Sequence, residues 1–91
     1  MSDKPDDNLY ISLGKVILQR RKDLGLSQEE LAKRSNVDRA FLSAVERGKR
    51  QPSFGTVSKV ASGLDIRYSQ LIKLCESCLE MMTKTPPTVT L

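Results

Sequence analysis

The stretch that decides the fold runs from Ser27 to Ser53 and reads SQEELAKRSNVDRAFLSAVERGKRQPS. Ser27 is a favourable helix N-cap, and Glu30, three residues later, completes a capping box. Asp38 is a second N-cap, and Gly48 ends the helix that follows it. Two short helices with a tight join form a helix-turn-helix, whose second helix fits the major groove of DNA. This stretch therefore predicts sequence-specific DNA binding.

Three more helices are predicted around this motif, which itself supplies helices over about 28–34 and 39–47. The first begins at Tyr10 or Ile11, ends at Leu24 and is closed by Gly25. One side of this helix carries, at helical spacing, Leu13, Val16, Ile17, Arg20, Arg21 and Leu24. Ser53 caps the fourth helix, and the fifth runs from about 68 to 82. The sequence thus predicts an all-α, five-helix domain over 10–82, with a disordered arm at 1–9 and a flexible tail at 83–91.

The composition fits a single small domain with a polyanionic partner. The 91 residues are 38% hydrophobic, enough for one modest core, and chains this short often gain stability by dimerising. The net charge of +4 is concentrated between residues 33 and 50, which hold six basic and two acidic residues. No signal peptide or membrane segment is recognisable, so we expect a cytoplasmic protein associated with the nucleoid.

The motif resembles the helix-turn-helix of the phage-repressor-like family, also called the xenobiotic-response-element family. The resemblance extends from Arg21 to about Ile66. It rests on SQEELA at 27–32, Val37, Leu42-Ser43, Glu46, Gly48 and Pro52-Ser53. It implies a lambda-repressor-like fold and a transcriptional regulator that represses, and in many cases also activates, often at its own promoter. The run DRAFLSAVERG also resembles the controller proteins of restriction–modification systems.

The second helix of the motif is expected to read the bases through its first residues. Arg39 can donate two hydrogen bonds to a guanine, Ala40 can touch a thymine methyl, and Ser43 can bond to a base edge or a phosphate. Ala40 and Ser43 could instead serve only to let the helix approach closely. The predicted phosphate contacts are Gln28, Phe41, Arg47, Lys49, Arg50 and Ser53. Of these, Gln28 rests on the resemblance, and Phe41 has a partly buried core position as its alternative.

Two further features concern structure and assembly. The resemblance implies a structural salt bridge between Arg21 and Glu46. The fifth helix carries more apolar surface than a lone small domain is expected to cover, which predicts a homodimer interface at Leu79, Met81 and Met82. Such a dimer would place two reading helices one DNA turn apart, about 34 Å, on a roughly palindromic operator.

Cys75 and Cys78 do not indicate a metal site or a thioredoxin-type redox site, and we expect them to be small buried or interface residues. A redox-sensitive contact between subunits is the alternative. The chain has no histidine, and two thiolates do not complete a zinc site, so no metal or other cofactor is expected. Without histidine or a glycine-rich phosphate loop, no enzymatic activity is predicted either.

Besides double-stranded DNA and a second copy of the chain, a toxin and RNA polymerase are candidate partners. The antitoxin of a toxin–antitoxin pair is the alternative function of a different class, whereas recognition of duplex RNA is disfavoured.

Overall fold

The computed structural model of the chain describes residues 7–83. These residues form five α-helices and no strand, which confirms the predicted all-α class. The helices are α1 (Asp7–Asp23), α2 (Gln28–Ser35), α3 (Arg39–Glu46), α4 (Phe54–Gly63) and α5 (Tyr68–Thr83). Over the described range, none of them has both the length and the apolar character needed to cross a membrane.

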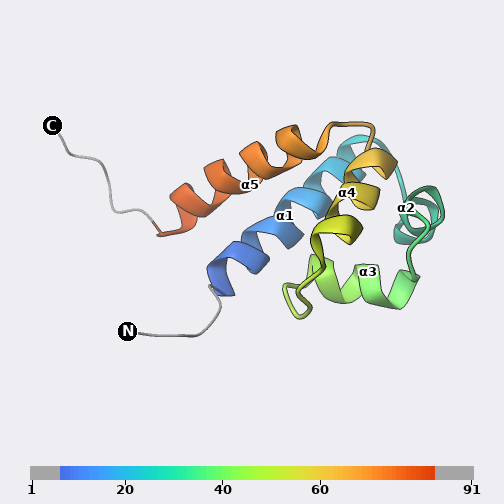
Figure 1. The fold of residues 1–91 in the computed structure, drawn as a ribbon, viewed down its shortest axis with the longest axis horizontal. Coiled ribbons are helices and arrows are strands. Elements are labelled where there is room, and N and C mark those ends of the chain that lie inside the picture. Colours follow the sequence, from blue (N-terminus) through green and yellow to red (C-terminus); the bar gives the residue numbers. More distant parts are fainter. Residues whose placement is uncertain (1–6, 84–91) are drawn as a thin grey trace, which may run out of the picture.

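The fold consists of a long helix pair and a cluster of three shorter helices (Figure 1). α1 and α5 lie side by side and run in opposite directions, and the shorter helices gather around one end of this pair. α3 lies along one edge of the molecule, where it packs against α1 and α2. The other side of α3 is uncovered, so the helix predicted to read DNA is accessible.

The core is built from apolar side chains that all five helices contribute. Its largest fully buried apolar members are Ile17, Leu31, Leu42, Leu64 and Leu71. Full burial of a side chain of this size stabilises a fold by about 1.5–3 kcal/mol. Because α3 contributes to the same core as α1, α2 and α5, packing fixes its position relative to the rest of the domain.

Gly25 and Gly48 end helices as the sequence predicted. Their φ angles of 74° and 73° lie in the left-handed region, which glycine adopts without steric cost. Gly48 also lies against α1, since a Cβ at this position would come within 3.0 Å of the Ile11 side chain. Position 48 therefore requires glycine both for the turn after α3 and for the close approach of the following loop to α1.

Helix α1 begins three residues before the earlier of its two predicted starts. The prediction of a disordered arm is therefore wrong for residues 7–9, where Leu9 faces α5 and its carbonyl accepts a 2.8 Å hydrogen bond from Ser12 Oγ. The helix ends at Asp23, one residue before its predicted end, and Leu24 is 38% exposed.

The chain ends also bear on the predicted domain limits. Thr83, which the prediction assigns to the tail, is the last residue of α5. Residues 1–6 of the predicted arm and 84–91 of the predicted tail lie outside the described residues.

Candidate nucleic-acid interface

Side-chain caps fix where α2 and α3 begin. The Ser27 hydroxyl accepts a hydrogen bond from Glu30 N at 3.0 Å, and the Glu30 carboxylate accepts one from Ser27 N at 2.8 Å, which completes the capping box. These bonds to Ser27 hold the pKa of the Glu30 carboxyl below its ordinary value. Asp38 accepts from Phe41 N at 3.1 Å and caps α3. Asn36, with φ of 57°, ends α2 between the two caps.

A buried ion pair anchors α3 to α1. Arg21 donates from Nε to Glu46 Oε2 at 2.7 Å and from Nη2 to Glu46 Oε1 at 3.0 Å, which is the pairing that the resemblance implied. The two side chains are only 11% and 3% exposed. Arg21 Nη1 also donates to the carbonyl oxygen of Leu26 at 2.8 Å. A two-pronged Arg–carboxylate contact fixes orientation as well as distance, so the last turn of α3 is held in one geometry.

Gln28 connects this ion pair to the beginning of α3. Its Nε2 donates to Glu46 Oε1 at 2.9 Å, and its Oε1 accepts a longer, 3.4 Å bond from Arg39 Nη1. An amide NH₂ group has two donors, and only one is needed for Glu46. Gln28 can therefore keep both protein contacts and still donate to a phosphate at the first turn of α2. The sequence did not predict that this residue would also contact Arg39.

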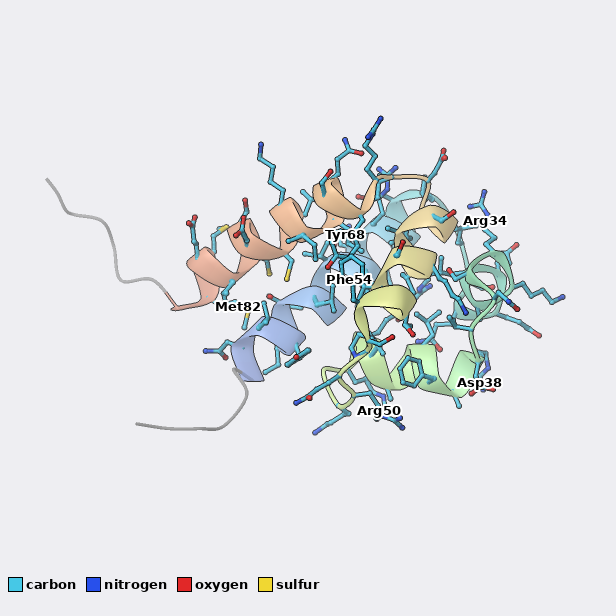
Figure 2. The ribbon with its side chains drawn as sticks, viewed as in Figure 1. Arg34, Asp38, Arg50, Phe54, Tyr68 and Met82 are labelled. Atoms are coloured by element: carbon cyan, nitrogen blue, oxygen red, sulfur yellow. The ribbon has the colours of Figure 1, made fainter. Side chains whose placement is uncertain are left out.

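Helix α3 has a buried side and an uncovered side. Leu42 and Val45 belong to the core. The residues that are exposed or half-exposed on the other side are Arg39, Ala40, Ser43 and Arg47. In Figure 2 the side chains of this region project along the edge of the molecule between Asp38 and Arg50. The structure thus brings together, on one surface, the residues predicted to read bases.

The loop after α3 extends this surface with positive charge. Lys49 and Arg50 are both exposed. The guanidinium carbon of Arg50 lies 4.9 Å from the ring centre of Phe41, a cation–π geometry that holds the loop against α3. Phe41 itself is half-buried and packs against the core, as the alternative interpretation of this residue predicted. Its ring therefore supports a basic side chain at the surface.

Ser53 lies at the end of the same loop and caps α4. Its hydroxyl accepts from Thr56 N at 3.1 Å and donates to Thr56 Oγ1 at 3.0 Å. The residue is exposed, so a phosphate could approach it. Its hydroxyl proton, however, is already engaged within the cap, and a phosphate contact would have to replace the bond to Thr56 Oγ1.

Gly14 positions α3 and was not singled out in the sequence. A Cβ at this position would collide with Val45 O and would lie 2.6 Å from Glu46 O, both of them backbone atoms at the end of α3. Glycine in a helix interior costs about 1 kcal/mol relative to alanine. A glycine in the middle of an otherwise apolar helical pattern is therefore the signal that could have indicated this close crossing.

The remaining predicted site lies near the end of α5. Leu79 is half-buried, whereas Met82 is 36% exposed and Met81 is 82% exposed. Cys75 is buried with its Sγ 3.2 Å from Ser12 Oγ, and burial raises the pKa of this thiol. Cys78 is half-buried, and both cysteines are free thiols. Cys75 is thus a small core residue, which agrees with the buried position among the two predicted for it.

Comparison with known proteins agrees with the geometry of this surface. The profile of one protein family, described as Helix-turn-helix, matches residues 17–71, which is more than half of the chain and spans α2 and α3. The control protein C.MunI of Mycoplasma is 35% identical over 66 residues, which cover 71% of this chain and 89% of that protein.

Two solved structures resemble the fold. The restriction–modification controller protein C.AhdI from Aeromonas hydrophila is 39% identical, with a TM-score of 0.66 over 68% of this chain and 94% of that chain. The controller protein C.Esp1396I, solved as a tetramer on its natural 35-base-pair operator, is 27% identical with a TM-score of 0.73, covering 78% and 93% of the two chains.

Proposed function

We propose that this chain, which belongs to the helix-turn-helix family of transcriptional regulators, binds a palindromic DNA operator as a homodimer. One observation carries the proposal. The uncovered start of α3 presents the Arg39 guanidinium, while its last turn is anchored to the core through the Arg21–Glu46 ion pair. A rigid helix with an exposed guanidinium at its amino-terminal end has the shape and the chemistry of a major-groove reader.

Base recognition is assigned to three residues of α3. Arg39 pairs with O6 and N7 of a guanine, and Gln28 supports its guanidinium from α2. Ala40 contacts a thymine methyl, and Ser43, one turn further along, contacts a base edge or a phosphate. Of the three, Arg39 contributes most of the specificity because it alone can make two directed bonds to one base.

Phosphate contacts surround this reading surface and fix its register on the duplex. We assign them to Gln28, Phe41, Arg47, Lys49, Arg50 and Ser53. Phe41 acts mainly through Arg50, whose guanidinium it supports. Each neutralised phosphate releases counterions, so binding should weaken as salt is raised.

The subtype that we propose is a restriction–modification controller. The support for it is the likeness to C.MunI and C.AhdI, both named as control or controller proteins. Such a regulator acts by binding and without catalysis, in the cytoplasm, where the nucleoid DNA is found. A methyltransferase or endonuclease gene beside its own gene would support this subtype.

The function is tested by comparing a base-reading variant with a phosphate-binding variant. Operator fragments are first selected from random DNA with the parent protein, and affinities are then measured by fluorescence anisotropy. Arg39→Ala should lose about 1–3 kcal/mol of discrimination at one base pair, which is roughly 5- to 150-fold. Lys49→Ala should weaken operator and random DNA alike and reduce the salt slope by about one.

Arg34→Ala is the charge-matched control. Arg34 is exposed on α2 and lies away from the edge marked by Asp38 and Arg50 in Figure 2, so its loss should leave binding unchanged. If Arg39→Ala keeps the parent's ratio of operator to random-DNA affinity, the reading role of Arg39 is wrong. If the parent selects no sequence from random DNA, the proposed function is wrong.

A further inference from the structure

An uncharged face lies beside the DNA-binding loop and takes no part in the surface described above. It surrounds a groove of about 230 Å³ between α1, α4 and α5. The groove is lined by Leu9, Tyr10, Leu13, Pro52, Phe54, Val57, Tyr68, Ile72 and Cys75. None of these side chains carries a charge, although 29% of the whole chain is charged. We call this surface the Phe54 face.

Phe54 is the most conspicuous member of this face. It is the first residue of α4 and is 69% exposed, with its ring centre 4.5 Å from that of Tyr68 (Figure 2). A large aromatic side chain left this open contributes little to the core of its own subunit. Exposed aromatic residues beside an apolar groove are typical of the centres of protein–protein interfaces.

The absence of charge favours a second copy of this chain as the partner. At a two-fold axis each patch meets itself, so a charged residue close to the axis faces a like charge. The Phe54 face avoids this repulsion and offers a projecting ring next to a groove, which is a self-complementary shape. Another groove along α5, lined in part by Val16 and Leu74, includes the charged residues Arg20 and Asp23.

The position of the Phe54 face also suits two copies on one DNA duplex. Pro52 belongs to the face and follows the exposed Arg50 by two residues, so the face adjoins the basic loop. A two-fold axis here, oriented along the direction in which the basic loops project, would place both loops and both α3 helices on one side of the dimer. Met81 lies 13 residues beyond Tyr68, about 20 Å further along α5, so an axis there would separate the two α3 helices much more.

We propose that two copies of this chain dimerise through the Phe54 face, with Phe54 of each copy seated against the groove of the other. This inference rests on the homodimer in the proposed function and specifies its interface. It replaces Met81 and Met82 as the centre of that interface. Leu79 follows Ile72 by seven residues and continues the Phe54 face along α5.

Two matched substitutions test the assignment. Phe54→Glu and Met81→Glu each place a carboxylate at an exposed apolar position, and an acidic residue in the first turn of α4 is favourable for the helix. Sedimentation equilibrium without DNA should show at least a tenfold larger dissociation constant for Phe54→Glu than for the parent. Met81→Glu should keep the parent's constant, and Phe54→Ala, which removes only the ring, should lie between.

The outcomes separate the interface from the function on which it rests. Phe54→Glu should keep the parent's circular dichroism spectrum. Phe54→Ala, which adds no negative charge beside the basic loop, should keep the parent's affinity for a single half-site and should lose part of the tighter binding to the full palindrome. If the folded Phe54→Glu variant dimerises as strongly as the parent, the Phe54 face is not the interface. If the parent protein stays monomeric both in solution and on the palindrome, the homodimer itself is wrong. If Arg39→Ala is the one variant that loses affinity for the half-site, DNA reading by Arg39 is upheld whether or not the chain dimerises.

Discussion

Gly14→Ala should loosen the contact between α1 and the end of α3. In the structure the two helices approach so closely that a Cβ at position 14 would meet the backbone carbonyls of Val45 and Glu46. The separation of 2.6 Å from Glu46 O must grow by at least 0.4 Å to reach 3.0 Å, below which real Cβ atoms essentially never approach another atom. Backbone carbonyls cannot rotate away as a side chain can, so the helices themselves must separate.

The size of this effect follows from two opposing contributions. Overpacking a tight site costs about 1–3 kcal/mol, and a clash with backbone belongs at the upper end of that range. Alanine in a helix interior recovers about 1 kcal/mol relative to glycine. The net loss in the free energy of unfolding is therefore about 2 kcal/mol, which lowers the Tm of a domain of this size by about 8–16 °C.

Thermal unfolding followed by circular dichroism measures this loss, and Gly55→Ala is its control. A Cβ at position 55 would meet only Ser53 Oγ, at 3.9 Å, so this variant should melt at or above the parent's Tm. Well below the Tm, Gly14→Ala should also bind DNA more weakly, because the displaced atoms belong to α3. If Gly14→Ala is as stable as the parent, the close crossing is not rigid and the reasoning fails.

Three further predictions concern the α2–α4 contact and the capping box. Gly63→Ala should destabilise the fold because its Cβ would collide with Ser35, and Ser35→Ala should restore part of the loss in a double-mutant cycle; strictly additive effects would contradict this coupling. Ser35→Ala alone should raise stability by about 1 kcal/mol, because the hydroxyl is buried without a hydrogen-bond partner in the described structure. Glu30 has a pKa lowered by its capping bonds, so its stabilising effect is present above the ordinary carboxyl pKa and is lost as pH falls through the lowered one. Melts of the parent and Glu30→Gln from about pH 3 to about pH 7 should therefore converge in acid, and a pH-independent difference would refute this linkage.

The helix starts within the motif could be predicted from sequence because capping is a local interaction. Ser27, Asp38 and Ser53 each accept a hydrogen bond from the backbone N–H three residues later, as their residue types indicated. The family resemblance added the Arg21–Glu46 pairing, which spans 25 positions of the chain and which helix periodicity alone does not specify.

Other features depend on tertiary contacts that periodicity does not contain. The early start of α1 depends on Leu9 facing α5, and the place of Gly14 depends on where α3 ends in space. The exposure of Phe54 could not be predicted from the sequence either, because an aromatic residue after an N-cap does not indicate which side chains will pack over it. The sequence therefore predicted the position of α3 but not the contacts that orient it or the exposure of Phe54.

The buried ion pair explains how orientation is transmitted to the reading surface. A buried salt bridge is weak support for stability, because the loss of hydration offsets most of the attraction between its charges. Here, however, Glu46 accepts bonds from both Arg21 and Gln28, and Gln28 in turn accepts one from Arg39. An apolar pair of the same volume could preserve the core but would leave Gln28 without its acceptor, and Arg39 without a fixed neighbour. We therefore expect the charge on Glu46, although it lies in a helix that is proposed to face a polyanion, to serve recognition by holding Arg21 and Gln28 in place.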